Sequence, residues 1–260
     1  KPYQFTVVDE AQDVGVPQLR FLASLAGSSA DALFFAGDLG QRIFQPTFSW
    51  RSLGVDVRGR SRTLWVNYRT SHQIRQQADR LLPPELADVD GNTESRRGTV
   101  SVFNGPDPLI KVCRDDGEEA ATVAAWVLER RAEGLQPHEV GVFVRSAAQL
   151  PRARAAIEAA GLEPLELREQ FDSQSGHVSI CTMHLAKGLE FRAVVVMACD
   201  DEILPLQQRI EAVADDADLE EVYNTERHLL YVACTRARDQ LLVTGVEPAS
   251  EFLDDLRLKE

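Results

Sequence analysis

The sequence has no apolar run long enough to cross a membrane. Its longest runs, such as Ala193–Ala198, fall far short of the roughly 20 residues that a membrane-spanning helix needs. No basic and then apolar leader opens the sequence, so a secretory signal is not expected either. We therefore expect a cytoplasmic protein that has no membrane partner.

Closely spaced cysteine pairs are also lacking. The four cysteines are far apart, form no CxxC pair, and three of them fall inside apolar strand-like or helical stretches. Free buried thiols are therefore expected, rather than disulfides or zinc ligands. The residues concerned are Cys113, Cys181, Cys199 and Cys234.

An excess of positive charge is missing as well. The formal net charge of −13 argues against a protein that coats nucleic acid by bulk electrostatics. The charge is unevenly distributed, because Asp200–Glu221 carries nine acidic residues and a single base, Arg209. We expect this stretch to be a solvated acidic loop, so any nucleic acid has to bind in a local groove elsewhere.

The opening stretch FTVVDEAQD predicts a strand that ends in two carboxylates. The apolar run Phe5–Val8 is fit for a buried parallel strand, and Asp9 and Glu10 follow it directly. Helical spacing over Pro17–Leu25 and a second apolar strand over Ala32–Ala36 complete a βαβ unit. Both strands of this unit then end in polar residues at one edge of the sheet.

The rest of the chain continues the α/β pattern. A strand over Thr63–Val66 and a helix over Ser71–Leu82 are followed by a polar loop or linker, Glu85–Gly98. From Thr99 strands and helices alternate, which predicts a second, mostly parallel sheet. Expected strands are Val100–Phe103, Leu109–Cys113, Val140–Val144, Val178–Cys181, Ala193–Met197 and Gln240–Thr244; expected helices are Glu118–Glu133, Ala147–Ala160 and Glu220–Ala237.

Asp9 and Glu10 are candidates for phosphoryl-transfer chemistry. Ligands of open α/β sheets bind at the carboxyl ends of the strands, where these two residues fall. Asp9 suits a Mg²⁺ ligand, directly or through water, and Glu10 suits the base that activates an attacking water. The alternative is a pair of carboxylates that caps the following helix.

Five stretches in a fixed order resemble the superfamily 1 helicases of the UvrD, Rep and PcrA group. They are VVDEAQD at Val7–Asp13, GDLGQRIF at Gly37–Phe44, LWVNYRT at Leu64–Thr70, TMHLAKGLEF at Thr182–Phe191 and ERHLLYVACTRA at Glu226–Ala237. Any one could arise by chance, whereas all five in the family's order make a strong signal. The first of them matches the Walker B segment of that family.

The resemblance implies ATP and Mg²⁺ as cofactors and assigns roles to five further residues. Gln41 reports the γ-phosphate and orients water, Arg69 and Arg236 from the two halves of the molecule contact the γ-phosphate, and Arg236 is the arginine finger. Tyr68 stacks on the adenine and Glu190 accepts a hydrogen bond from the ribose. The alternatives are a turn amide for Gln41, surface ion pairs for the arginines and a core aromatic residue for Tyr68.

The same resemblance implies that Trp50 stacks on the bases of single-stranded DNA. The spacing departs from the family here, because Phe44 stands in a tyrosine position and about four extra residues, Gln45–Phe48, precede Ser49 and Trp50. Either Phe48 or Trp50 is therefore the stacking residue.

Further contacts with the phosphates of the DNA strand are expected from the fourth stretch. There, Thr182 and His184 resemble residues that touch these phosphates, and Lys187 supports the same loop. For His184 the alternative is a purely structural histidine.

A Walker A segment, GxxxxGK followed by Ser or Thr, is absent from these 260 residues. We expect residues 1–70 to be the C-terminal part of a truncated first RecA-like domain, 71–98 a helix and linker, and 99–260 a second RecA-like domain. The Walker A segment would act from elsewhere, in cis or in trans. The distance from Arg69 to Thr182 is also short, so we expect that the chain lacks the large accessory domain of UvrD-like enzymes or keeps only a stub of it.

The expected parent is an ATP-driven helicase or translocase on single-stranded DNA, with 3′–5′ polarity implied by the resemblance. It would be cytoplasmic and associated with the nucleoid when on DNA, and the fragment itself is expected to hydrolyse little or no ATP. Two alternatives are a non-catalytic regulatory or partner-binding module and the helicase subunit of a helicase–nuclease.

Overall fold

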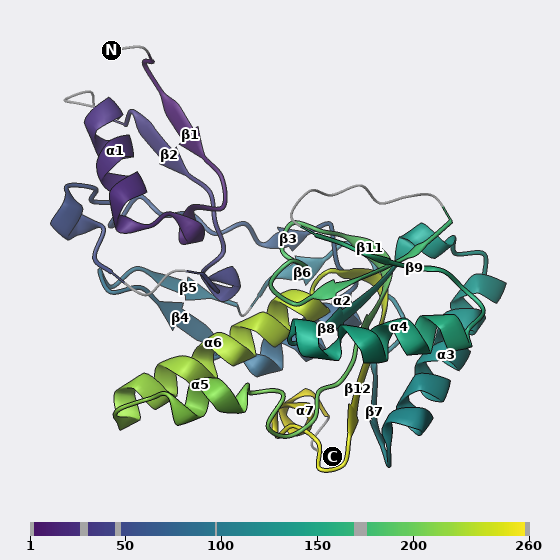
Figure 1. The fold of residues 1–260 in the computed structure, drawn as a ribbon. Coiled ribbons are helices and arrows are strands. Elements are labelled where there is room, and N and C mark those ends of the chain that lie inside the picture. Colours follow the sequence, from purple (N-terminus) through teal and green to yellow (C-terminus); the bar gives the residue numbers. More distant parts are fainter. Residues whose placement is uncertain (1–2, 27–30, 45–47, 97, 169–175, 258–260) are drawn as a thin grey trace. The chain divides into compact units, whose positions relative to one another are not determined.

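A computed structural model describes residues 3–26, 31–44, 48–96, 98–168 and 176–257 (Figure 1). The chain forms two compact units: unit 1 comprises Lys1–Trp65 and Pro83–Thr99, and unit 2 comprises Val66–Leu82 and Val100–Glu260. Val66–Leu82 therefore groups with unit 2, whereas the sequence analysis ended the first domain at residue 70. The identification of the units as RecA-like domains stays a prediction.

Unit 1 contains the expected βαβ arrangement. Strand β1 (Thr6–Val8) pairs in parallel with β2 (Leu33–Phe35), and helix α1 (Val16–Ala26) connects them. The connection is helical because its apolar residues recur with helical spacing, and Leu19 on the inner face is fully buried. This part of the prediction is confirmed.

The predicted linker after residue 84 is instead a small antiparallel hairpin. Strand β4 (Glu85–Ala87) pairs with β5 (Thr93–Ser95). Asp88 closes the turn between them, because its carboxylate accepts hydrogen bonds from the backbone N–H groups of Asp90 and Asn92. The polar composition of this segment predicted a loop. The sequence analysis did not foresee that the Asp88 side chain would stabilise a tight turn between two strands.

The prediction that the opening strand is buried was wrong. Phe5 is 71% exposed, Val7 is 72% exposed and Phe34, the partner of Val7 in the register, is 63% exposed. Alternate residues share one face of a strand, so these side chains form one uncovered apolar face. Within the described residues of unit 1 this sheet has only two strands and no second layer over that face.

Unit 2 is built on a six-stranded parallel sheet with the order β7-β12-β11-β8-β10-β9. Its strands are β7 (Leu109–Cys113), β8 (Val140–Val144), β9 (Pro164–Glu166), β10 (Val178–Thr182), β11 (Phe191–Val196) and β12 (Ala237–Val246). The central strands are Val-rich, as expected for strands covered on both faces, and every residue of β8 is buried. The α/β fold class is confirmed; the edge strand β9 was missed because its short sequence is neither alternating nor strongly apolar.

Helices cover this sheet. Helix α3 (Asp116–Ala132) and helix α4 (Leu150–Ala159) pack against each other, as Figure 1 shows, and the core beneath them includes Trp126, Ile157 and Ile180.

The four cysteines are buried and free, as expected. Burial raises the pKa of Cys181 to about 12, which keeps that thiol protonated and unreactive.

The remaining helices of unit 2 are α2 (His72–Ala78), α5 (Gln207–Glu211), α6 (Asp216–Cys234) and α7 (Phe252–Leu256). Helix α6 begins four residues before the predicted start, because the carboxylate of Asp215 caps it by accepting a hydrogen bond from the N–H of Asp218. The expected acidic loop, Asp200–Glu221, is thus partly helical. None of the helices in the described residues is long and apolar enough to span a membrane.

Two short strands precede the large sheet in the chain. Strand β3 (Val66–Asn67) pairs in parallel with β6 (Val100–Ser101), so the strand expected at Thr63–Val66 is shifted toward the C-terminus. This pairing joins the third of the five stretches, which carries Tyr68 and Arg69, to the start of the long C-terminal segment of unit 2.

Gly141 offers a test of packing in the sheet. A Cβ atom at this position of β8 would lie 2.7 Å from the Phe191 ring, closer than van der Waals contact allows. We expect Gly141→Ala to lower the free energy of unfolding by ~1–3 kcal/mol. In a denaturant-unfolding double-mutant cycle, Gly141→Ala combined with Phe191→Leu should lose less stability than the two single variants summed. Simple additivity would contradict the proposed steric clash.

Candidate functional site

The carboxyl ends of β1 and β2 bring two polar loops together in unit 1. The Ala11 N–H donates to the Ala36 carbonyl over 2.8 Å, which holds the loop after β1 against the loop after β2. Asp9 and Glu10 are both exposed on the first loop. Glu10 has a left-handed backbone (φ 52°), which costs a residue with a Cβ about 1–2 kcal/mol. Such strained positions concentrate at functional sites.

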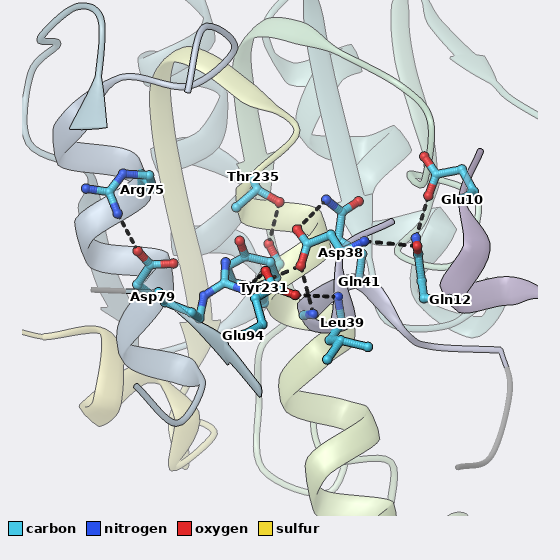
Figure 2. A network of polar contacts seen from close by, with 12 residues as sticks. Glu10, Gln12, Asp38, Leu39, Gln41, Arg75, Asp79, Glu94, Tyr231 and Thr235 are labelled. Carbon is cyan, nitrogen blue, oxygen red and sulfur yellow. Dashed lines mark hydrogen bonds and ion pairs between the residues drawn. The ribbon is translucent and has the colours of Figure 1, made fainter. Parts of the chain in front are cut away.

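A chain of hydrogen bonds joins Glu10 to Gln41 (Figure 2). The side-chain amide of Gln12 donates to the Glu10 carboxylate and accepts a hydrogen bond from the backbone N–H of Asp38 over 3.0 Å. The Asp38 carboxylate in turn accepts from the Gln41 amide over 2.8 Å and from the Gly40 N–H over 2.8 Å. The structure therefore connects the predicted base with the predicted γ-phosphate sensor.

Gln12 and Asp38 were missed as site residues. Both lie in the quoted motifs, Gln12 four residues after the end of β1 and Asp38 three residues after the end of β2, and this position was the available signal. The β4–β5 hairpin supports the second loop, because Glu94 accepts a hydrogen bond from the Leu39 N–H over 3.1 Å and Arg96 lies 3.4 Å from the Asp38 carboxylate. The segment predicted to be a linker thus helps to position the site.

Asp9 has the chemistry of a single magnesium ligand. Its carboxylate accepts a hydrogen bond from the Glu10 N–H over 2.9 Å, which fixes one oxygen. Within the described ranges there is no group of three or more His, Cys, Asp or Glu side chains that could hold a metal by themselves. Mg²⁺ is commonly held by one or two carboxylates together with waters and substrate phosphates, so Asp9 fits that pattern.

Trp50 lies against strand β2 of unit 1. Its ring meets the Phe35 ring edge-to-face, with centroids 4.8 Å apart, and it is half-buried. Asp90 fixes the neighbouring backbone by accepting hydrogen bonds from the Ser49 hydroxyl and the Arg51 N–H. Phe48 is also half-buried, and residues 45–47 of the insertion lie outside the described residues. Which ring stacks on DNA stays open.

Tyr68, Arg69 and Glu190 come together in unit 2. The Arg69 guanidinium pairs with the Glu190 carboxylate over 2.9 Å, and both side chains are about half exposed. Tyr68 is 74% exposed, which rules out the core-aromatic alternative. The Asn67 carboxamide accepts from the N–H groups of Arg69 and Thr70, and this turn orients the two predicted nucleotide contacts.

Arg236 belongs to the same unit as Arg69, so the expectation that they come from two halves was wrong. Its side chain is held on the last turn of α6, where its Nε donates to the Val232 carbonyl over 3.1 Å and its Nη2 to the Thr235 hydroxyl over 3.4 Å. Arg236 is 1% exposed, which excludes the surface ion pair considered for it. A cation is stabilised at a helix C-terminus by the helix dipole.

The loop after β10 carries the predicted DNA-phosphate contacts. The Thr182 carbonyl accepts hydrogen bonds from the N–H groups of Leu185 and Ala186, which folds the loop into tight turns. Burial, followed by the nearby positive charge of Arg145, lowers the pKa of His184. His184 is therefore neutral near pH 7 and supplies a hydrogen bond there, not a charge. Lys187 on the same loop is half-buried.

A buried ion cluster behind this loop was not foreseen. Arg145, directly after β8, donates to both carboxylate oxygens of Glu226 over 2.5 and 2.6 Å, and Arg209 donates to one of them over 2.9 Å. Glu226 is completely buried and the Arg145 side chain is 5% exposed. Glu226 opens the fifth motif, and Arg209 is the one base of the acidic stretch, yet nothing in their spacing predicted the pairing.

Comparison with known proteins finds a matching family model. Residues 153–247 match the family model described as the UvrD-like helicase C-terminal domain. Over this range the chain is therefore similar to UvrD-like helicase C-terminal domains. Four of the predicted site residues fall within the matched range: Thr182, His184, Glu190 and Arg236. Unit 1 and the Tyr68–Arg69 segment lie outside it.

Two curated relatives carry helicase names. The chain is 25% identical to the ATP-dependent DNA helicase UvrD2 of Mycobacterium tuberculosis, over 93% of this chain and 47% of the relative. It is 41% identical to the ATP-dependent DNA helicase PcrA of Staphylococcus epidermidis over 77 residues, which is 30% of this chain and 10% of PcrA. The chain thus spans about half the length of UvrD2 and a tenth of PcrA.

The alignment with UvrD2 is longer than this chain, since it extends over 337 positions against 260 residues. UvrD2 therefore has segments within the aligned region that this chain lacks. Among solved structures, the C-terminal domain of a possible DNA helicase from Lactobacillus plantarum WCFS1 covers 74% of this chain and 94% of its own, with 21% identity and a TM-score of 0.49.

The buried Arg145–Glu226 pair of unit 2 predicts a large loss of stability when it is broken. Glu226→Ala leaves the Arg145 guanidinium buried without its carboxylate, which should cost ~3–5 kcal/mol in the free energy of unfolding measured with urea. The control is Arg114→Ala, which removes an exposed i,i+4 pair with Glu118 and should leave stability unchanged. Equal stabilities of the two variants would contradict a structural role for the buried cluster.

Proposed function

We propose that this chain is the part of an ATP-dependent superfamily 1 DNA helicase or translocase that extends from the Walker B segment onward. The observation that carries the proposal is the hydrogen-bond chain from Glu10 through Gln12 and Asp38 to Gln41, at the carboxyl ends of parallel strands. This is the edge of a sheet at which α/β proteins bind nucleotides. The helicase names of the relatives supply the substrate classes, ATP and DNA.

In this proposal the unit 1 residues prepare the attacking water. Asp9 would hold Mg²⁺, which would supply positive charge beside the phosphates, and Glu10 takes the proton of the water as it attacks. Gln41 orients that water beside the γ-phosphate. Support comes from the exposure of both carboxylates and from the fixed loop that carries them.

The unit 2 residues bind the nucleotide and supply positive charge. Tyr68 stacks on the adenine, Glu190 accepts a hydrogen bond from the ribose, and Arg69 and Arg236 stabilise the charge that develops on the γ-phosphate. The exposed Tyr68 ring and the Arg69–Glu190 pair support this assignment, since both are accessible to a ligand. Arg236 has to leave its contacts with the Val232 carbonyl and the Thr235 hydroxyl in order to act as a finger.

On the DNA side, Trp50 stacks on bases, and Thr182 and His184 hydrogen-bond to phosphates. Phe48 is the other candidate for stacking. Because His184 is neutral near pH 7, its phosphate contact is a hydrogen bond from the ring N–H and contributes no ionic attraction. Single-stranded DNA is the proposed polymer and 3′–5′ the proposed direction, by family resemblance; the nucleoid is the proposed site of action.

A segment with the Walker A sequence is the proposed further partner, in cis or in trans. Phosphates need backbone N–H groups and a lysine of the GxxxxGK type, and these 260 residues contain no such sequence. The uncovered face formed by Phe5, Val7 and Phe34 supports this proposal, because parallel sheets are normally covered on both faces. Unit 1 is then the remainder of a first RecA-like domain, and unit 2 is the second.

Two other functions compete with this proposal. A non-catalytic partner-binding module would have no chemical need for the linked Glu10 and Gln41, so their connection favours the enzyme. A helicase subunit of a helicase–nuclease would share every contact described, and its nuclease residues would lie outside this sequence.

The proposal predicts a defined pattern of ATPase activity. The parent polypeptide should hydrolyse ATP faster when single-stranded DNA is added, and these 260 residues alone should show no turnover. In the parent, Glu10→Gln removes the base and should lower kcat by about 10²- to 10⁴-fold. Arg236→Ala should lower it by about 10³- to 10⁵-fold.

Arg114→Ala, which alters an exposed ion pair, serves as the control and should leave kcat unchanged. Robust turnover by the 260 residues alone would overturn the requirement for a Walker A segment. If the Glu10→Gln variant kept the kcat of the wild type, the assignment of Glu10 as the base would be overturned.

DNA binding tests the stacking residue. Trp50→Ala in the parent should weaken binding of a fluorescent oligo(dT) by about 5- to 150-fold in anisotropy measurements at fixed salt, the equivalent of ~1–3 kcal/mol for one stacked base. Phe48→Ala should change it less, and Val89→Ala, at another exposed apolar residue of unit 1, should not change it. The reverse order of effects would assign stacking to Phe48.

A further inference from the structure

We propose that Gln12 is a positioning residue for ATP hydrolysis, one that orients the Glu10 carboxylate through a direct hydrogen bond. The inference rests on the proposed function, since it assumes that Glu10 is the base. Gln12 itself reaches neither nucleotide nor metal in this proposal. It acts by fixing Glu10 on one side and the loop that carries Asp38 and Gln41 on the other.

Both functional groups of the Gln12 amide are engaged. Its nitrogen donates to the Glu10 carboxylate, and its oxygen accepts from the Asp38 N–H over 3.0 Å. The residue is only 7% exposed, although its neighbours Asp9 and Glu10 are exposed. A polar side chain that is buried with a donor and an acceptor both satisfied is held in one orientation.

The backbone of Gly37 is shaped around this amide. A Cβ atom at position 37 would lie 2.5 Å from the Gln12 oxygen, closer than real Cβ contacts, and 3.2 Å from the Ala11 nitrogen, which is tighter than most of them. Glycine therefore lets the loop after β2 approach the Gln12 amide without displacing it. Gly37 and Gln12 are therefore two parts of one contact between the loops.

An amide is the side chain that this position requires. One neighbour is a carboxylate, which needs a donor, and the other is a backbone N–H, which needs an acceptor. A glutamate at position 12 would keep the acceptor but set one carboxylate against another. A leucine would fill the space and satisfy neither group, so the Asp38 N–H would lose this acceptor.

Orientation matters for Glu10 because its side chain is exposed to solvent. It lies in an exposed loop, with a left-handed backbone rather than in a strand or helix. A base has to lie within hydrogen-bond reach of the proton it removes, and displacement of about 1 Å can cost ~10²-fold in rate. The Gln12 contact fixes the carboxylate before any substrate arrives.

The first experiment separates catalysis from binding in the parent polypeptide. Gln12→Glu and Gln12→Leu should lower the DNA-stimulated kcat by about 10- to 100-fold, which is the usual effect of losing a residue that orients an active-site group through a hydrogen bond. The KM for ATP should stay within about threefold of the wild-type value. Gln18→Glu, which makes the same charge change on the exposed side of α1, should leave both constants unchanged.

The outcomes distinguish this inference from the proposed function. An inactive wild-type parent would refute the proposed function itself. An active wild type with unchanged kcat in both Gln12 variants would overturn the positioning role alone. A KM that rises in proportion to the fall in kcat would also overturn it, because that pattern indicates general damage to nucleotide binding.

A second measurement does not depend on activity. Gln12→Glu should lower the Tm of the 260-residue chain, whereas the exchange Glu10→Gln with Gln12→Glu reverses the amide and the carboxylate and keeps both hydrogen bonds. The exchanged variant should therefore recover most of the lost Tm. Failure of the exchange to recover any of it would overturn the direct contact on which the inference depends.

Discussion

Parallel pairing of β1 with β2 determines where the candidate chemistry of unit 1 lies. Parallel strands end at the same edge, so the loop with Asp9 and Glu10 and the loop with Asp38 and Gln41 begin side by side. The hydrogen bond from Ala11 to Ala36 and the Gln12 amide then hold the two loops together. The same rule operates in unit 2, where Arg145 follows β8 and His184 follows the adjacent strand β10.

The two units differ in where they place their carboxylates. Glu226 of helix α6 is fully buried and accepts hydrogen bonds from two arginines. Arg145 lies at the end of β8 and Arg209 lies in α5, so these bonds link α6 to both elements. A buried pair of this kind contributes little net stability compared with apolar packing, but it permits only one arrangement of its partners. In unit 1 the carboxylates of Asp9 and Glu10 are exposed, and this exposure is what their proposed roles require.

The apolar face of the β1–β2 sheet in unit 1 is uncovered, and the sheet itself has only two strands among the described residues. Phe5, Val7 and Phe34 are the residue types of a buried parallel strand, yet within the described part of unit 1 nothing lies over them. Large exposed apolar patches usually mark interaction surfaces. The composition of the strand and its exposure are consistent if a further polypeptide segment completes this layer.

Much of the fold was predictable from local pattern. Apolar runs and helical spacing were sufficient for the βαβ unit, for the central strands of the large sheet and for its main helices, because burial and period are local properties. The motifs likewise identified Glu10, Gln41, Arg69, Glu190 and Arg236 as candidates. The β4–β5 hairpin and the shifted start of α6 were missed, since each depends on aspartate hydrogen bonds that composition does not reveal.

Only the tertiary structure decided which of these residues act together. Gln12, which also bonds Glu10, contacts Asp38 across 26 positions of sequence, and Arg145 contacts Glu226 across 81. No periodicity or spacing encodes such pairs, because they depend on which strand ends are adjacent and on how closely two backbones approach at Gly37. The sequence by itself determined which reactive side chains this protein has. The order of the strands determined which of those side chains lie in contact.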